Sequence, residues 1–118
     1  MGLFDVLRGR GSAGRTRAAG ARDAAYLESW AAGHHGVEAF IEPKTTVTDT
    51  TVVLVAHDGE WTRRRISGPA AAYQLGRRLG IPVYEVRLVG YPQRMRDFNA
   101  RRKILQAREQ AARDRPAG

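Results

Sequence analysis

The stretch TVVLVAHDGEWTRRRI (residues 51–66) decides the fold, because it holds two strand-forming runs on either side of an Asp-Gly pair. Residues 51–57 are apolar at nearly every position, which is typical of a central strand that is covered on both faces. Asp-Gly between two such runs is the strongest short-range hairpin signal, and it predicts a two-residue type I′ turn. We therefore expect two antiparallel strands joined at Asp58-Gly59.

That turn also predicts a register for the hairpin. It places His57 opposite Glu60, Ala56 opposite Trp61 and Leu54 opposite Arg63. Trp61, Arg63 and Arg65 would then share a sheet face with Leu54. A slip of one residue would move every side chain of a strand to the other face, so the faces depend on the turn.

The flanking sequence predicts further helices and strands around this hairpin. Pro69 after Gly68 and Gly80 at the far end are typical of the two ends of a helix. The other expected elements are helices at 22–33 and 93–113 and strands at 37–42 and 83–89. In chain order this is helix-strand-strand-strand-helix-strand-helix. The fold class is α+β, with a small, mainly antiparallel four-stranded sheet backed by helices and a long basic C-terminal helix.

The length of 118 residues suits one domain. Residues 1–20 are expected to form a flexible basic segment with a short amphipathic start, since the linker that follows this start is rich in Gly and Arg. Residues 21–105 would form the single α+β domain, with the first three turns of the last helix docked on it. Residues 106–118 would be a projecting basic helix end with a frayed tail.

The composition excludes several classes of protein. The chain has no Cys, so it has no disulfide scaffold, thiolate zinc site or cysteine nucleophile. No run approaches the roughly 18 apolar residues that a spanning helix needs, and the first residues do not have the order of a signal peptide. We therefore expect a cytoplasmic protein without a transmembrane segment.

The net charge of +8 lies at the two ends of the chain. Residues 21–90 hold as many acidic as basic residues, whereas residues 91–118 have a clear basic excess. Basic ends bind nucleic acid, an acidic protein or an anionic membrane surface. The alternative interpretation is that Arg is simply the default solvating cation of an Arg-rich, Ala-rich and Gly-rich sequence.

The last helix carries the best functional signal, because its apolar stripe ends while its cations continue. Arg contacts phosphate with two parallel hydrogen bonds, so such a helix is suited to a phosphate backbone. We predict a non-enzymatic module that binds RNA or a ribonucleoprotein such as the ribosome, with the strand residues Arg63 and Arg65 as secondary contacts. The predicted contacts of the helix are Arg94, Arg96, Arg101, Arg102, Lys103 and Arg108.

A second hypothesis is a protein-interaction adaptor. Its apolar N-terminal residues Leu3, Phe4 and Leu7 would dock on one partner, and the C-terminal helix would dock on an acidic protein. The neutral domain between them would act as a spacer. The sequence does not indicate an oligomeric state.

An enzyme is the third hypothesis, and no metal or cofactor is expected. The adjacent residues His34 and His35 point about 100° apart on a helix, so they do not converge on one metal ion. They are expected to cap a helix end. His57 and Glu60 are expected to form a cross-strand ion pair at the hairpin tip.

Three segments resemble a family of small actinobacterial proteins that has no established mechanism. They are FIEPKTTVT (40–48), AHDGEWTRRR (56–65) and GIPVYEVRLVGYPQRMRD (80–97). Some members of that family carry a general oxidoreductase label. This chain has no Gly-rich dinucleotide fingerprint and no redox Cys pair, so it gives that label no support. The resemblance therefore implies no catalytic or binding residue.

Overall fold

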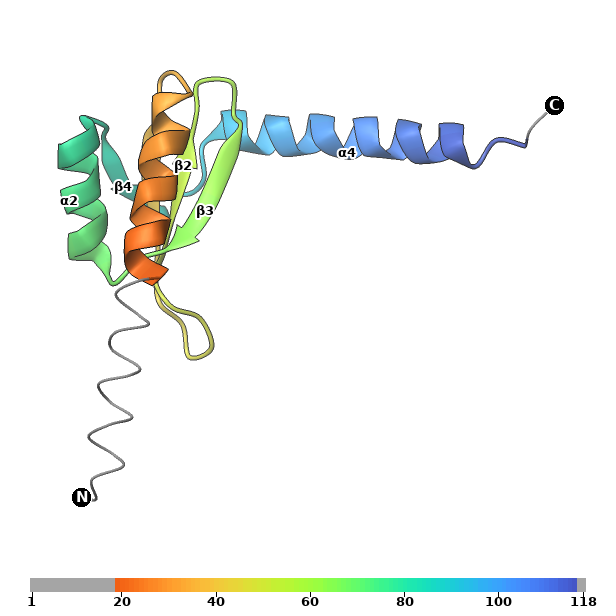
Figure 1. Ribbon diagram of the computed structural model, residues 1–118. Helices are drawn as coiled ribbons and strands as arrows, with labels where there is room; N and C mark the ends of the chain where they lie inside the picture. The colour runs from red at the N-terminus through yellow and green to blue at the C-terminus, as the bar shows by residue number, and fades with distance from the viewer. Residues whose placement is uncertain (1–18, 117–118) are drawn as a thin grey trace.

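A computed structural model describes residues 19–116, which form a sheet with helices on both faces and one long projecting helix (Figure 1). The first described element is a helix over residues 19–32. The other elements, in chain order, are β1 (Glu38–Glu42), β2 (Thr51–Val55), β3 (Trp61–Arg65), α2 (Pro69–Leu79), β4 (Val83–Glu85), α3 (Val86–Val89) and α4 (Gln93–Arg113).

The four strands form one mixed sheet in the order β3-β2-β1-β4. β2 pairs antiparallel with both β1 and β3, and the short β4 pairs in parallel with β1. The predicted class, α+β with a four-stranded sheet backed by helices and a C-terminal helix, is confirmed. β1 and β2 are the two central strands, which explains why their sequences are the most apolar.

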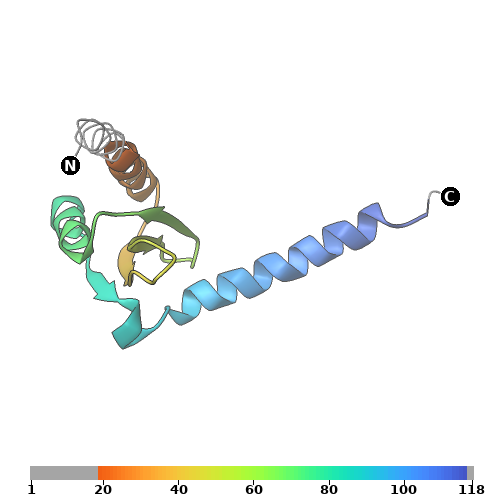
Figure 2. The same ribbon diagram turned by 90° about the horizontal axis from the view of Figure 1, so that it is seen from below.

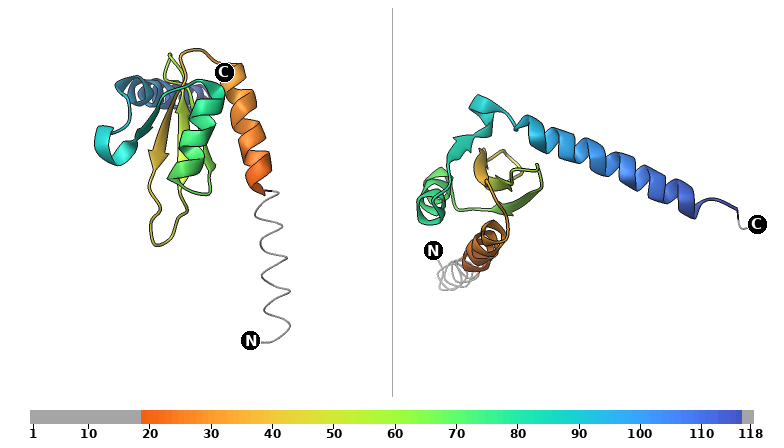
Figure 3. Two further views of the ribbon diagram at one scale, coloured as in Figure 1. Left: turned by 90° about the vertical axis from the view of Figure 1, so that its left-hand side faces the viewer. Right: turned by 90° about the horizontal axis from the view of Figure 1, so that it is seen from above.

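The two faces of the sheet are covered differently (Figures 2 and 3). The helix at 19–32 and α2 lie side by side over one face, and Leu27, Leu54 and Leu75 belong to the core between them. Among residues 19–116, the other face is covered by α3 and the start of α4. Its smaller core consists of Phe40, Val53, Val55 and Met95.

The hairpin register differs from the predicted one by one residue. Trp61 pairs with Val55 instead of Ala56, and the loop holds three residues, 57–59, because Ala56 N–H donates to the carbonyl of Glu60. Gly59 has φ +92°, which is the left-handed residue that a three-residue hairpin loop requires. The predicted two-residue turn is therefore wrong.

The slip exchanges the faces of β3. Thr62 and Arg64 now lie on the face of the helix at 19–32, where the Arg64 guanidinium stacks 3.7 Å from the ring centre of Tyr26. Trp61 and Arg63 lie on the opposite face, beside the core of α4. The predicted grouping of Trp61 with Leu54 is wrong, and Trp61 instead joins Phe40 and Met95.

The predicted strand at 83–89 is also only partly correct. Pairing of β4 with β1 ends at Ile41↔Glu85, because Glu42 is the last residue of β1 and Pro43 follows it. Residues 86–89 have no strand to pair with, and they close one helical turn in which Gly90 N–H donates to the carbonyl of Val86. Leu88, in this turn, is 67% exposed.

The boundaries of α2 and α4 agree with the prediction. Pro69 opens α2, and Gly80 ends it in the left-handed conformation. The docking of α4 is shorter than the expected three turns, since Met95 is its one buried residue and every residue from Asn99 to Pro116 is exposed. Leu105, expected at the end of the docked part, is 55% exposed. Within residues 19–116, no helix has both the length and the apolar character needed to cross a bilayer.

Candidate nucleic-acid interface

The first turn of α4 is seated on the tip of the β2–β3 hairpin. Gly59 lies so close to this turn that a Cβ atom there would overlap the carbonyl oxygen of Arg94 and press against Phe98. The Gly59 amide donates to the carbonyl of Ala56, and Asp58 Oδ1 accepts from the amide of Glu60, 3.0 Å away in both cases. The hairpin loop is therefore held in a shape that leaves room for the helix.

Arg94 ties this first turn to the sheet. Its Nε donates to the carbonyl oxygen of Ala56 at 2.9 Å, and its Nη2 lies 2.6 Å from Oε1 of Glu38. A second, longer bond of 3.3 Å joins Nη2 to the carbonyl of Val55. All of these acceptors belong to the domain, so the Arg94 guanidinium points inward.

Two more contacts hold the following turns of α4. The indole Nε1 of Trp61 donates to Oδ1 of Asn99 at 2.7 Å, and Arg101 Nη2 donates to the carbonyl of Asp58 at 3.1 Å. The Asn99 amide is thereby oriented, with its NH2 group left for other acceptors. Beyond residue 101, none of the hydrogen bonds or ion pairs of the described residues joins α4 to the domain.

A second anchor connects β1, β2, β3 and the segment before α4 through the carboxylate of Glu42. Arg63 donates to both of its oxygens, from Nε at 2.6 Å and from Nη2 at 2.9 Å. The hydroxyl groups of Thr51 and Tyr91 donate to the same carboxylate. Glu42 is thus a shared acceptor for three neighbouring side chains.

Burial and these bonds have opposite effects on the titration of the Glu42 anchor. Burial acts to raise the pKa of Glu42, but the bonds from Arg63, Thr51 and Tyr91 outweigh it and hold that pKa below its ordinary value. The pKa of Tyr91 is raised by burial and by its bond to the ionised Glu42. The pKa of Arg63 is raised mainly by its bond to Glu42.

The hypothesis of an enzyme predicts a perturbed titratable group with access to substrate, and the Glu42 anchor does not have this form. Both carboxylate oxygens are already engaged by donors of the domain. We therefore assign Glu42 and Tyr91 a structural role: they fix the segment from which α4 starts. Within residues 19–116, no group of three or more metal-ligating side chains comes together.

The histidines meet at the same end of the sheet. His34 Nδ1 lies 2.6 Å from the carbonyl of Trp30, which places His34 at the helix end as expected. Glu60 lies 3.1 Å from His34 Nε2, so the expected ion pair of Glu60 with His57 is wrong. His57 instead bonds to the carbonyl of His35.

Among the described residues, most arginines of the domain are ion-paired, with Arg22 and Arg77 as exceptions, whereas the cations of α4 beyond Arg94 are not. Six arginines lie within ion-pair distance of a carboxylate, and Arg94 is the last of them along the chain. The described residues place no carboxylate at that distance from the later cations of α4. These cations are Arg96, Arg101, Arg102, Lys103, Arg108 and Arg113.

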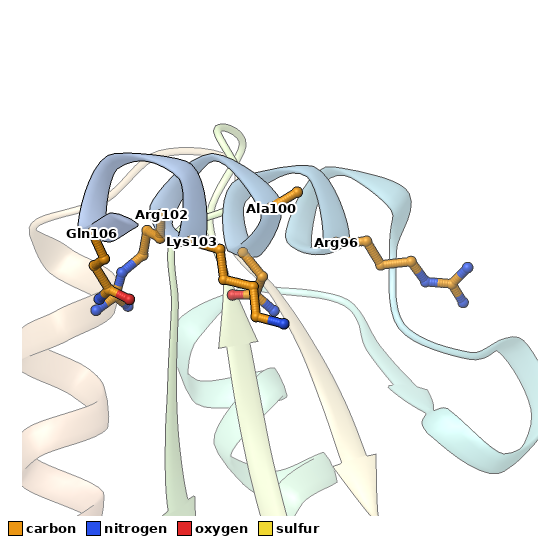
Figure 4. A pocket seen from close by; sticks show the side chains of 6 residues that line it. Arg96, Ala100, Arg102, Lys103 and Gln106 are labelled. Atoms are coloured by element: carbon orange, nitrogen blue, oxygen red, sulfur yellow. The ribbon is translucent and has the colours of Figure 1, made fainter. Parts of the chain in front are cut away.

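One side of α4 carries a shallow, open depression between exposed side chains. We call this side the hollow face; its residues are Arg96, Asn99, Ala100, Arg102, Lys103 and Gln106. Figure 4 shows the side chains of Arg102, Lys103 and Gln106 extending from the same side of the helix. The hollow face begins at Arg96, includes Asn99, which Trp61 holds, and continues onto the projecting part.

The structure separates the predicted contacts into two groups. Arg96, Arg101, Arg102, Lys103 and Arg108 lie on α4 without a carboxylate partner. Arg94 and Arg63 are ion-paired with the domain, so they are poor candidates for phosphate contacts. Arg65 lies 3.7 Å from Asp49, and both side chains are largely exposed. Leu3, Phe4 and Leu7 lie outside the described residues.

Gln106 was missed by the sequence-based prediction, which selected the cations of the last helix as its contacts. Its spacing of seven residues from Asn99 puts both amides on one helical face and is the signal that could have found it.

Comparison with protein-family models, with curated proteins and with solved structures found no match to this chain.

Proposed function

We propose that this protein binds structured RNA, free or within a ribonucleoprotein such as the ribosome, through the exposed part of α4. The observation that carries the proposal is the run of cations on α4 beyond Arg94 that have no carboxylate at ion-pair distance among the described residues, whereas six arginines from Arg63 to Arg94 are ion-paired. An unpaired, solvated cation releases a counterion from RNA without first breaking an internal ion pair.

The placement of the cations on α4 supports a partner with phosphates in several directions. At about 100° per residue, Arg101 and Arg108 lie nearly opposite the centre of the hollow face, which carries Lys103. A flat anionic surface would reach only one of these sides. A folded RNA presents phosphates at several angles and can contact both.

The test is a fluorescence anisotropy titration with a labelled RNA hairpin at 50 and 200 mM salt. With about six phosphate contacts, we expect affinity to fall about 10³-fold between these salt concentrations. A variant with Arg102→Gln, Lys103→Gln and Arg108→Gln should reduce the slope of log K against log salt by roughly 2–3.

The matched control removes the same charge from the domain, through Arg22→Gln, Lys44→Gln and Arg77→Gln, which are all exposed and have no carboxylate at ion-pair distance within residues 19–116. The RNA affinity of this control variant should stay within about threefold of that of the natural chain, because the proposal assigns the phosphate contacts to α4. Equal losses in the two triple variants would refute the proposal. Binding that is absent at physiological salt in the natural chain would refute it as well.

A second candidate function is the adaptor, and the exposure of Ile104 and Leu105 favours it. These residues are 52% and 55% exposed, and within residues 19–116 the helix makes no hydrogen bond or ion pair to the domain beyond residue 101. Their replacement by Gln should leave RNA affinity unchanged if α4 binds RNA through its cations. An association in cell extract that survives ribonuclease and is lost on Ile104→Gln/Leu105→Gln would support the adaptor instead.

A further inference from the structure

We propose that the hollow face of α4 contacts the bases of an RNA stem at a bulge or internal loop. This inference rests on the proposed function and names the class of RNA and the side of α4 that recognises it. It follows from three observations: the order of amides and cations on the hollow face, the hydrogen-bond partners of the glutamines of α4, and the diameter of an α-helix.

The hollow face has hydrogen-bonding amides in its middle and cations at its edges. Taken around the helix axis at about 100° per residue, Asn99 and Gln106 lie between Arg102 on one side and Lys103 with Arg96 on the other. Amide side chains hydrogen-bond to base edges, whereas cations contact the phosphates that flank them. This order fits a groove with bases at its floor and phosphates at its rims.

The three glutamines of α4 differ in their partners. Gln93 donates to Asp97 and Gln110 donates to Asp114, in both cases four residues further along the helix. Gln106 has no hydrogen-bond partner within residues 19–116, and it lines the hollow. Its amide is therefore available as both a donor and an acceptor, which a base edge requires.

Asn99 is held ready at the near end of the same face. The bond from Trp61 uses its Oδ1, so the Asn99 NH2 group is presented as a fixed donor. The tie also fixes the distance between the domain and the first base contact.

The width of an α-helix limits the RNA structures whose bases α4 can contact. A helix with side chains is about 10–12 Å across, and the major groove of a regular A-form duplex is too narrow and deep for side chains to read its bases. Unpaired or splayed bases at a bulge or loop are accessible, and most sequence-specific recognition of RNA occurs there. A regular duplex would offer the cations its phosphates but would keep its bases from Gln106.

The experiment measures the affinity of the full chain at physiological salt for four labelled nucleic acids. These are an RNA stem with a bulge, the same stem without it, a single strand of equal composition and the matching DNA duplex. The bulge sequence is first selected from a pool of stems with randomised bulges. We expect the selected bulged stem to bind at least about tenfold more tightly than the other three.

Variants then separate base contacts from phosphate contacts. Gln106→Ala should remove most of the tenfold preference while changing affinity for the regular stem by less than about twofold. The matched amide control, Gln110→Ala, should keep the preference, because Gln110 is engaged with Asp114. Arg108→Ala, on the opposite side of α4, should weaken binding to all four nucleic acids by a similar factor.

The outcomes distinguish failure of this inference from failure of the proposed function. Equal affinity for bulged and regular stems, an unchanged preference in Gln106→Ala, or tighter binding of the DNA duplex would overturn the role of the hollow face while nucleic-acid binding stands. Absence of RNA binding at physiological salt would overturn both. Circular dichroism of each variant checks that α4 remains helical.

Discussion

The carbonyl oxygen of Arg94 occupies the space in which a side chain at position 59 would stand, so Gly59 and Arg94 together set where α4 leaves the domain. Gly59 also has a positive φ of +92°, which L-residues rarely adopt. The hairpin tip is therefore constrained by its own backbone and by the helix above it.

Replacing Gly59 by Ala should dislodge the first turn of α4. The added methyl group meets main-chain atoms that have no easy way to move, and the conformation itself is strained, so we expect a loss of about 1–3 kcal/mol. Thermal unfolding should show a midpoint lower by about 5–15 °C. Gly20→Ala is the control, since a Cβ there meets open space within a helix, and it should be neutral or slightly stabilising. Similar midpoints for the two variants would contradict the assigned contact.

Arg94→Gln should weaken the fold without changing the salt dependence of RNA binding. The guanidinium donates to the carbonyl of Ala56 and pairs with Glu38, so its loss should cost about 1–3 kcal/mol. A phosphate contact, by contrast, would lower the slope of log K against log salt by roughly 1. We would measure both quantities for Arg94→Gln and for Arg108→Gln, in which the two effects should be reversed. A reduced slope in Arg94→Gln would place its guanidinium on RNA.

Glu42 should make the stability depend on pH in the acid range. Its pKa is lower in the folded chain than the ordinary value of 4.5, so its contribution is complete above that pH and is lost as the pH falls below it. Glu42→Gln should cost about 1–2 kcal/mol at pH 7, a modest value because the Arg63 side chain is 41% exposed. Chemical unfolding of the natural chain and of this variant at pH 7, 5, 4 and 3 should give curves that converge toward acid. For Glu109→Gln, on the exposed part of α4, the plot of unfolding free energy against pH should be parallel to that of the natural chain. A parallel plot for Glu42→Gln would contradict the role of Glu42 as an anchor.

Asn99→Ala should leave the indole N–H of Trp61 without its acceptor. Because the side chain is half-buried, we expect a stability loss of about 1 kcal/mol and a change in the emission of Trp61. The measurement uses a Trp30→Phe background, so that Trp61 is the one emitter. Gln106→Ala lies about two helical turns further along the same face and has no hydrogen bond to Trp61, so it should leave the emission of Trp61 unchanged. An unaltered spectrum in Asn99→Ala would argue against the Trp61–Asn99 bond in solution.

The limits of α2 and α4 could be predicted because local residues set them. Pro69 and Gly80 act on the backbone directly, and neither needs a neighbour to do so. The hairpin register could not be predicted in this way. β2 is apolar on both faces, so its pattern does not favour one register. The observed loop places Gly59 against Arg94, which is 35 positions distant, and the local sequence does not show that contact.

The strand at 83–89 shows a related limit. Its alternating pattern continues to Val89, but a strand needs a partner, and β1 ends at Glu42.

The basic charge of the candidate site and its position on α4 could be predicted, because the sequence itself shows the excess of basic residues there. Which arginines form ion pairs depends on the sheet face on which each side chain lies. The ion pair of Arg63 therefore depends on the hairpin register, which the sequence left ambiguous. Gln106 required knowledge of which amides are already bonded.

The separation of charge from mass has a consequence for how the protein meets a partner. Residues 19–92 are electrically balanced, whereas residues 93–116 hold eight basic residues against three acidic ones. The described part of the molecule is therefore a strong electric dipole whose positive end is a thin rod, the helix α4. In the field of a polyanion it would rotate during diffusion so that the rod approaches first, which raises the fraction of productive encounters and makes the association rate, more than the dissociation rate, sensitive to ionic strength.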